Sequence, residues 1–389
     1  MRVLHVINSL SGSGGAEQGM VREIVRFEPS VEQMMVRLYQ PDQLEPQLVE
    51  AGVVSRCLGL ESGNSGWNWP AGARRLGSHI RDFQPDIIHS SLASANLISQ
   101  IAAERAGLPV LSTFTLSGDP ALMRRYQPGA AKLRAQVLRR IERVWARRSH
   151  VWFRALTTDA KETNSQVAGL DPDRVEVIPR GVPMPDETAS PPSRSYLGLP
   201  DDRPLILNVG RQTAQKGHAD LVEAFAGVLA RVPAHLVILG REGDGTEALQ
   251  TAITAFGVGE HVSIVPYNER PYDFYRSADV FAFPSLMEGL GTAVLEAMAC
   301  GLPVVAYDIP PVNEVTGRGE RATLVPVGAV SQLSEAVAAV LVEPGPASAT
   351  ARAAREEIRA GYSLDGVAKR LESHLMDVCN LAAETPPGR

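Results

Sequence analysis

Residues 281–303 read FAFPSLMEGLGTAVLEAMACGLP. A short apolar run comes first, then a turn with two glycines, an apolar helical pattern and a second β-rich run at 304–307. This order predicts strand, turn, helix and strand, which is the repeating unit of a parallel sheet. The same alternation of short β-rich runs and helical patterns continues on both sides of this stretch. We therefore expect an α/β protein with helices on both faces of its parallel sheets.

The chain is long enough for two such sheets. It has 389 residues, more than the roughly 250–300 at which a single hydrophobic core stops growing. We expect two doubly wound, Rossmann-like domains that face each other across a cleft, with ligands outside the carboxyl ends of the strands. The expected parts are an N-terminal, acceptor-side domain over 1–185, a Pro-rich hinge over 186–203, a donor domain over 204–365, and a C-terminal helix and tail over 366–389 that pack back on the N-terminal domain.

Composition and charge exclude several classes of protein. Apolar residues make up 44% of the chain and charged residues 21%, which is typical of a globular enzyme. The net charge of −6 argues against a nucleic-acid partner, and no apolar run approaches the roughly 18–20 residues of a membrane span. Three widely separated cysteines exclude a disulfide framework or a zinc ribbon. With a first strand expected from Arg2, no signal peptide is expected, and we predict a cytoplasmic protein.

Two glycine-rich turns precede predicted helices. The first contains Gly12, Gly14 and Gly15, and the start of the following helix offers free N–H groups to an anion. Its spacing is not GxGxxG, which disfavours nicotinamide binding, and a turn that only enters a helix stays open. The second turn places Arg211 and Lys216 between Gly210 and Gly217. An arginine fork and a lysine point charge suit a diphosphate, although two solvated loop cations are the alternative.

Two glutamates stand out in the opening stretch. Glu288 falls in the turn and Glu296 in the helix that follows. A carboxylate accepts two hydrogen bonds at once, which suits the vicinal hydroxyls of a sugar or ribose. Because Glu296 has apolar neighbours, its carboxylate would be costly to bury without a partner. The alternative for Glu296 is a solvated helix face.

Together these motifs resemble those of the retaining, nucleotide-sugar-dependent glycosyltransferases of family 4, which have the GT-B fold. The resemblance covers nearly the whole chain and is carried by Gly14-Gly-Ala-Glu17, Val177-Ile-Pro-Arg-Gly-Val182, Gly210-Arg211 with Lys216-Gly217, and Glu288-x7-Glu296.

The resemblance implies roles for individual residues. Arg211 and Lys216 would hold the donor diphosphate and stabilise the leaving group. Glu288 would contact the transferred sugar, and Glu296 would bind the ribose hydroxyls. The remaining implied donor contacts are main-chain groups at Gly289, Leu290, Gly291 and Thr292, the loop at Tyr267 near the base, and Gly15 near the diphosphate.

The chain departs from the family pattern in two places. Family members often carry a histidine where this chain has Thr115, at the end of a predicted strand. His89, at the end of another predicted strand, is a candidate to replace it on the acceptor and sugar side, or else a structural residue. The usual asparagine of the hinge motif is Arg180, for which the sequence offers no interpretation.

The predicted function is retaining transfer of a hexose from a nucleoside-diphosphate donor to an acceptor hydroxyl. UDP is the family preference, and the acceptor is a glycan, a lipid-linked compound or a small molecule. No nucleophile for a covalent double displacement is visible, so we favour same-face attack within an ion-pair-like state. The alternatives are a nucleotide-sugar epimerase of the same architecture and a non-catalytic sugar- or nucleotide-binding module.

No cofactor and no metal are expected, since the nucleotide-sugar is a substrate. Asp171-Pro-Asp173 is a literal DxD string, the metal motif of another glycosyltransferase fold. Asp and Pro favour turns, so we interpret the string as a turn.

A basic segment suggests a second partner. Residues 124–148 hold nine Lys and Arg against one acid, Glu142, and residues 1–186 carry a net +3 while 187–389 carry −9. An apolar stripe at helical spacing predicts an amphipathic helix, with Trp145 as a core anchor. The stripe consists of Leu133, Val137, Ile141, Val144 and Trp145. The helix either packs on the core and exposes its basic face to solvent, or docks with that face on the inner surface of an anionic membrane.

Overall fold

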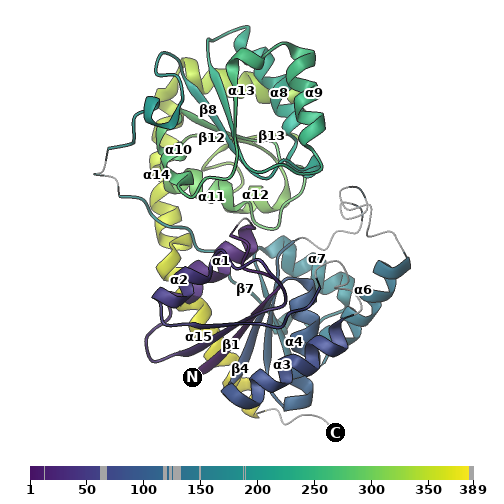
Figure 1. The fold of residues 1–389 in the computed structure, drawn as a ribbon. Coiled ribbons are helices and arrows are strands. Elements are labelled where there is room, and N and C mark those ends of the chain that lie inside the picture. Colours follow the sequence, from purple (N-terminus) through teal and green to yellow (C-terminus); the bar gives the residue numbers. More distant parts are fainter. Residues whose placement is uncertain are drawn as a thin grey trace. The chain divides into compact units, whose positions relative to one another are not determined.

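The computed structural model describes residues 1–12, 14–61, 68–116, 121, 125, 133–148, 150–186, 188 and 190–384, with the backbone alone over 133–139. The chain divides into two compact units (Figure 1). Unit 1 comprises Met1–Gly181 and Leu364–Arg389, and unit 2 comprises Val182–Ser363. Each unit is built around its own sheet.

Unit 1 contains a parallel sheet of seven strands in the order β3-β2-β1-β4-β5-β6-β7. The strands are β1 (Arg2–Ile7), β2 (Glu32–Arg37), β3 (Val54–Cys57), β4 (Ile87–Ser91), β5 (Val110–Phe114), β6 (Val151–Ala155) and β7 (Val175–Val177). The chain starts in the middle of the sheet and reverses its direction of winding between β1 and β4. This reversal makes the carboxyl ends of β1 and β4 a topological switch point, where doubly wound sheets bind ligands.

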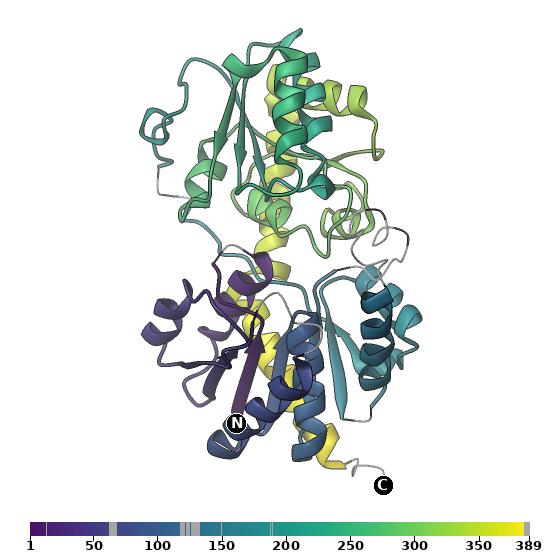
Figure 2. The same ribbon diagram turned by 45° about the vertical axis from the view of Figure 1, so that its right-hand side comes forward.

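Helices cover both faces of this sheet (Figure 2). They are α1 (Gly15–Ile24), α2 (Glu45–Glu50), α3 (Trp69–Phe83), α4 (Ala93–Ala106), α6 (Leu133–Ala146), α7 (Thr158–Ala168) and α15 (Leu364–Glu384). One core lies under α3 and α4, and the other lies under α1 and α15. The C-terminal helix α15 belongs to unit 1 because its stripe of Val367, Leu371, Leu375 and Val378 is buried in that second core.

Unit 2 repeats the design with six parallel strands in the order β10-β9-β8-β11-β12-β13. The strands are β8 (Leu205–Val209), β9 (His235–Leu239), β10 (Val262–Val265), β11 (Val280–Phe283), β12 (Val304–Tyr307) and β13 (Thr323–Val325). The helices are α8 (His218–Leu229), α9 (Thr246–Phe256), α10 (Pro271–Ser277), α11 (Thr292–Ala299), α12 (Pro310–Val315), α13 (Val330–Val342) and α14 (Pro344–Tyr362). Its switch point lies between β8 and β11. The predicted α/β class with two doubly wound sheets is confirmed.

The Pro-rich stretch 186–203 differs from the expected hinge. The units divide at Gly181 and Val182, ahead of this stretch, which belongs to unit 2. Arg194 forms an ion pair with Asp279 at 2.7 Å, and Ser277 donates to the carbonyl oxygen of Pro192 at 3.2 Å. Proline cannot donate to a sheet, but its carbonyl still accepts hydrogen bonds, so the segment is fixed by side chains of unit 2.

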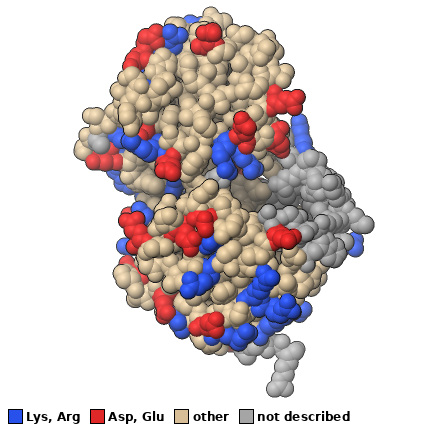
Figure 3. All heavy atoms as spheres, in the orientation of Figure 1, with Lys and Arg blue, Asp and Glu red and all other residues tan. Residues whose placement is uncertain are grey.

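Acidic and basic side chains intermingle over both units in the view of Figure 3. Within the part of the chain that the structure describes, none of the helices has the length and apolar character needed to cross a bilayer.

Candidate functional site

The switch point of unit 2 brings two predicted motifs to one edge of the sheet. The ladder between β8 and β11 covers Ile206 with Val280 and Leu207 with Phe281. Beyond it, the side chain of Asn208 donates to the carbonyl oxygen of Ala282 at 2.8 Å. The loop with Arg211 and Lys216 follows β8, and the loop with Glu288 follows β11. Both therefore leave the carboxyl ends of adjacent strands, as the doubly wound topology predicts for a ligand site.

The two loops are fixed to each other. The backbone N–H of Leu286 donates to the carbonyl oxygen of Gln215 at 2.8 Å. Gly217 has φ +65°, and a Cβ there would collide with the carbonyl oxygen of Pro284. Glycine is required at this position because a side chain would be strained and would also push the loops apart.

The central contact of this site is an ion pair between Lys216 and Glu288. Lys216 Nζ lies 2.5 Å from Glu288 Oε1, and the side chains are 18% and 12% exposed. The ammonium group also lies over the ring of Phe283, 5.5 Å from its centroid. Because both charges are partly shielded from water, their interaction is stronger than that of an exposed pair. Arg211 is exposed on the same loop, so the structure places both predicted cations at this edge.

Glu296 is buried on the inner face of α11 and is 8% exposed. Tyr275 of α10 donates its hydroxyl to Glu296 Oε2 at 3.1 Å. Burial, followed by the charge of Glu296, raises the pKa of Tyr275 well above its ordinary value, so the hydroxyl keeps its proton. The alternative of a solvated helix face for Glu296 is wrong, because Tyr275 supplies a partner that allows the carboxylate to be buried.

The other predicted donor contacts of unit 2 lie in the turn before α11 and in the loop after β10. Gly289, Leu290 and Gly291 are buried in the turn that leads into α11, whose first residue is Thr292. Tyr267 is 44% exposed in the loop after β10, two strands from β8 in the sheet.

His218, for which the sequence motifs predicted no role, supports the loop of Lys216. It is the first residue of α8 and is 3% exposed. His218 Nε2 donates to Asn208 Oδ1 at 3.0 Å, while Nδ1 has no partner among the residues that the structure describes. Burial, and then the charge of Lys216, lowers the pKa of His218 to about 4, so the ring is neutral. Its place directly after Lys216-Gly217 was the available sequence signal.

In unit 1, the predicted site residues Gly15 and Thr115 are exposed and half-buried, respectively. Gly15 is the first residue of α1, is exposed, and has open space around the direction of a Cβ. The first turn of α1 therefore presents backbone N–H groups outward, as expected for an anion site. Thr115 is half-buried and follows the end of β5 directly.

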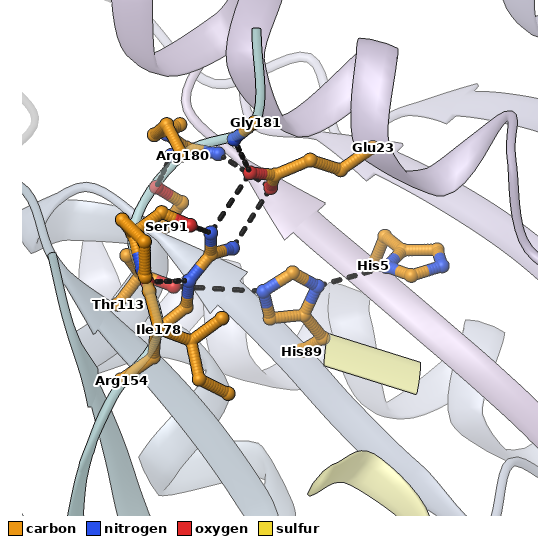
Figure 4. Close-up of polar contacts among 10 residues, drawn as sticks. His5, Glu23, His89, Ser91, Thr113, Arg154, Ile178, Arg180 and Gly181 are labelled. Carbon is orange, nitrogen blue, oxygen red and sulfur yellow. Dashed lines mark hydrogen bonds and ion pairs between the residues drawn. The ribbon is translucent and has the colours of Figure 1, made fainter. Parts of the chain in front are cut away.

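His89 is an interior residue, which corrects its proposed place on the acceptor side. It is 1% exposed on β4, beside His5 of β1 (Figure 4). With Gln33 Oε1 accepting from His5 Nε2 at 3.0 Å, His5 Nδ1 accepts from His89 Nδ1 at 3.2 Å. His89 Nε2 then accepts from the Thr113 hydroxyl at 3.5 Å. Burial first, and then neighbouring cations and His5, lower the pKa of His89, so it remains a neutral member of this chain of hydrogen bonds.

Arg180 belongs to a buried ion cluster beside that chain (Figure 4). Arg154 binds both carboxylate oxygens of Glu23 at 2.8 Å, and Arg180 binds Oε2 at 3.0 Å. The backbone N–H of Gly181 donates to Oε1 at 3.3 Å. Arg154 also donates to the carbonyl oxygen of Ile178 at 2.7 Å. The cluster thus connects α1 to the segment 178–181, which directly precedes unit 2. This contact gives Arg180 the role that the sequence left without interpretation.

The basic helix α6 and the two residues after it carry an exposed arginine cluster, which we define as Arg140, Arg143, Arg147 and Arg148. Together with Val144 these residues line a surface pocket of about 680 Å³. Val144 is 57% exposed, so the prediction that it belongs to the core-facing stripe is wrong. Ile141 and Trp145, in contrast, pack against the core of unit 1. The predictions for Arg124 and Lys132, and for the side chains over 133–139, lie outside the described residues.

The Asp171-Pro-Asp173 string forms a turn. Asp171 Oδ1 accepts from the backbone N–H of Asp173 at 3.1 Å and caps a short 3-10 helix over Pro172–Arg174. Over the described ranges, no group of three or more His, Cys, Asp and Glu side chains is arranged to hold a metal ion.

The chain is similar to known proteins along most of its length. Residues 190–357 match the family described as Glycosyl transferases group 1, and residues 14–181 match the Glycosyl transferase 4-like domain. The chain is 30% identical over 332 residues to a D-inositol 3-phosphate glycosyltransferase of Xylanimonas cellulosilytica, covering 82% of this chain and 77% of that protein. It is 27% identical over 308 residues to a 2-deoxystreptamine N-acetyl-D-glucosaminyltransferase of Streptomyces fradiae, covering 77% and 72%.

Solved structures show the same fold. Anabaena Alr3699/HepE, in complex with UDP and glucose, aligns with a TM-score of 0.81 at 18% identity, over 97% of this chain and 100% of that one. A sucrose-phosphate synthase from Thermosynechococcus elongatus aligns with a TM-score of 0.80 at 19% identity, over 99% and 100%.

Proposed function

Because the chain belongs to the family 4 glycosyltransferases, which have the GT-B fold, we propose that it transfers a hexose from a UDP-sugar to an acceptor hydroxyl with retention of anomeric configuration. The observation that carries the proposal is the contact of Lys216 with Glu288, which joins a diphosphate-binding cation to a sugar-binding carboxylate at the switch point. The choice of UDP is supported by the fold neighbour that binds UDP and glucose.

The proposed reaction breaks the bond between the anomeric carbon and the diphosphate oxygen. Negative charge then grows on the leaving diphosphate, and positive charge grows on the sugar. Arg211, Lys216 and the N–H groups at the start of α11 stabilise the leaving group, because preorganised charges act most strongly where charge develops. The leaving phosphate oxygen takes the proton of the acceptor hydroxyl, whose oxygen bonds to the anomeric carbon on the same face. These two cations supply the positive charge that the step needs, so we propose that it uses no metal.

The remaining donor contacts follow from the same arrangement. Glu288 binds hydroxyls of the transferred sugar, and Glu296 binds the ribose hydroxyls through its carboxylate oxygens. Main-chain groups over 289–292 line the phosphates, and Tyr267 contacts the base. For unit 1 we propose two roles, namely that Gly15 is a phosphate contact and that Thr115 belongs to the acceptor side.

Two observations support two different classes of acceptor. Two relatives are named for small ring acceptors, inositol 3-phosphate and 2-deoxystreptamine. The arginine cluster of α6 instead supports a lipid-linked acceptor at an anionic membrane. All three cysteines are free thiols, which suits the reducing cytoplasmic side of such a membrane.

A donor panel tests the proposed reaction. The protein is incubated with UDP-, GDP- and ADP-glucose, with and without a mixture of polyol and lipid-linked acceptors, and products are identified by mass spectrometry. We expect UDP release that depends on acceptor and persists in EDTA, together with a product carrying an α-linked hexose. Isomerised nucleotide-sugar without acceptor would instead indicate an epimerase. Binding of a donor without turnover under any condition would indicate a non-catalytic module.

The arginine cluster predicts binding to anionic vesicles. Each surface cation near an anionic bilayer contributes up to about 1 kcal/mol, and the attraction weakens with salt. We expect co-sedimentation with phosphatidylglycerol vesicles but not with phosphatidylcholine vesicles, and less binding at physiological than at low salt. Arg140→Glu with Arg143→Glu should abolish it.

The matched control is Arg81→Glu with Arg105→Glu, the same charge change at exposed positions on α3 and α4. It should leave most of the vesicle binding in place. Equal loss in both double variants, or no preference of the wild type for anionic lipid, contradicts a membrane role for α6 and favours the small-molecule acceptor.

A further inference from the structure

We propose that Tyr275 is a positioning residue, which fixes the carboxylate of Glu296 for recognition of the donor ribose. The inference deepens the proposed function and rests on it. It starts from a buried hydrogen bond whose two partners lie on different helices, with Tyr275 on α10 and Glu296 on α11.

The hydroxyl of Tyr275 fixes one oxygen of the carboxylate. Oη lies 3.1 Å from Glu296 Oε2, and the two residues are 1% and 8% exposed. A phenol hydroxyl swings only about its C–O bond, so once the ring is held, the direction of its hydrogen bond is nearly fixed. The carboxylate of Glu296 is then held in a defined orientation. For a group that must accept from two vicinal hydroxyls, such preorganisation lowers the entropic cost of binding.

The ring of Tyr275 is held by an aromatic column, which we define as Tyr275, Phe281 and Phe283. The centroid of Tyr275 lies 5.5 Å from that of Phe281, which lies 5.7 Å from that of Phe283. Phe281 and Phe283 are two residues apart on β11, so their side chains share one face of the sheet. All three side chains are buried, and such aromatic pairs resist displacement.

The column also reaches the other half of the site. Lys216 Nζ lies over the ring of Phe283 and pairs with Glu288. One packed set of side chains therefore supports both the carboxylate assigned to the ribose and the cation assigned to the diphosphate. Removing only the hydroxyl of Tyr275 separates positioning from packing, because phenylalanine keeps the ring in the column.

The experiment compares a ribose with a ribose lacking its hydroxyls. Calorimetry measures the dissociation constant of whichever of UDP, GDP and ADP binds the wild type most tightly, and of its 2′,3′-dideoxy analogue. The dissociation constant of the analogue divided by that of the normal nucleotide measures recognition of the hydroxyls, and we call this quotient the ratio of the two constants. We expect Tyr275→Phe to weaken binding of the normal nucleotide about tenfold and the analogue little, so that the ratio falls by a similar factor.

Tyr307→Phe is the matched control. Tyr307 donates to Asp220 Oδ2 at 2.9 Å, so the control also removes a tyrosine–carboxylate hydrogen bond from unit 2. It should leave the ratio of the two constants unchanged. Glu296→Gln should also weaken the normal nucleotide, and its effect should not add to that of Tyr275→Phe, because both act through one carboxylate.

The outcomes separate the two proposals. If the wild type binds none of the three nucleotides, the proposed function fails, and the positioning role fails with it. The positioning role is supported if the wild type binds the normal nucleotide more tightly than the analogue, and if Tyr275→Phe lowers the ratio of the two constants while Tyr307→Phe does not. If Tyr275→Phe weakens both nucleotides equally, or its effect adds fully to that of Glu296→Gln, Tyr275 is only a packing residue and the donor site stands without it.

Discussion

Lys216→Ala is expected to lower kcat/KM by at least about 100-fold, which is the scale for losing one group that stabilises charge in a transition state. The ammonium group lies 2.5 Å from Glu288 Oε1 and over the ring of Phe283, so its position is fixed before any substrate arrives. The substitution removes the cation assigned to the leaving diphosphate and also leaves Glu288 without this partner. Arg211→Ala, on the same loop, should lower kcat/KM on a similar scale. The measurement is steady-state release of nucleoside diphosphate.

Lys369→Ala is the matched control, because it makes the same change on an exposed position of α15 in unit 1. It should retain the wild-type kcat/KM. Circular dichroism and thermal unfolding show whether Lys216→Ala is folded. Turnover like that of the wild type in a folded Lys216→Ala protein would remove Lys216 from the reaction.

Glu23→Gln is expected to lower the free energy of unfolding by about 3–5 kcal/mol, the usual cost of breaking a buried ion pair by removing one partner. The carboxylate is fully buried and binds Arg154 and Arg180. Without its charge, two guanidinium groups would remain buried with no neutralising partner in the cluster. Urea unfolding followed by circular dichroism measures the change, and Glu50→Gln on the exposed end of α2 should change the unfolding free energy by less than about 0.5 kcal/mol.

The cluster of Glu23, Arg154 and Arg180 also makes the free energy of unfolding depend on pH. Burial alone would raise the pKa of Glu23, but the charges of Arg154 and Arg180 and the hydrogen bonds outweigh it and lower the pKa below its ordinary value of 4.5. A carboxyl whose pKa is lower in the folded state stabilises the fold above its unfolded pKa, and the contribution is lost as the pH falls through the folded value. The difference in stability between wild type and Glu23→Gln should therefore be constant near neutral pH and shrink in acid. A difference that grows in acid would contradict this account.

Several features of unit 2 could be predicted from local sequence. The strand-turn-helix-strand order predicted over 281–307 appears in the structure as β11, α11 and β12. The apolar neighbours of Glu296 correctly indicated a carboxylate that needs a partner. Patterns of this kind depend on residues close together in the chain, and burial of one face of a helix or strand follows from its own periodicity.

Predictions about individual side chains were weaker. The sequence places His89 at the end of a strand, where functional side chains collect in α/β proteins, yet β4 continues to Ser91 and His5 of β1 lies beside His89. Val144 follows the helical spacing of the stripe but lies on the exposed face among the arginines. In both cases the deciding factor is which neighbour covers the residue, and no local pattern contains that information.

By itself, the sequence determined the class of the fold, the two glycine-bounded loops and the chemical groups available to them, because these depend on composition and short-range spacing. Only the tertiary structure decided which groups meet. The order of strands joins Lys216 to Glu288 across 72 residues and Glu23 to Arg154 across 131. It also makes Tyr275 the partner of Glu296 and returns α15 to unit 1. Contacts of this range form only when the winding of each sheet brings its strands side by side, so their partners are set by topology and packing rather than by any stretch of chain.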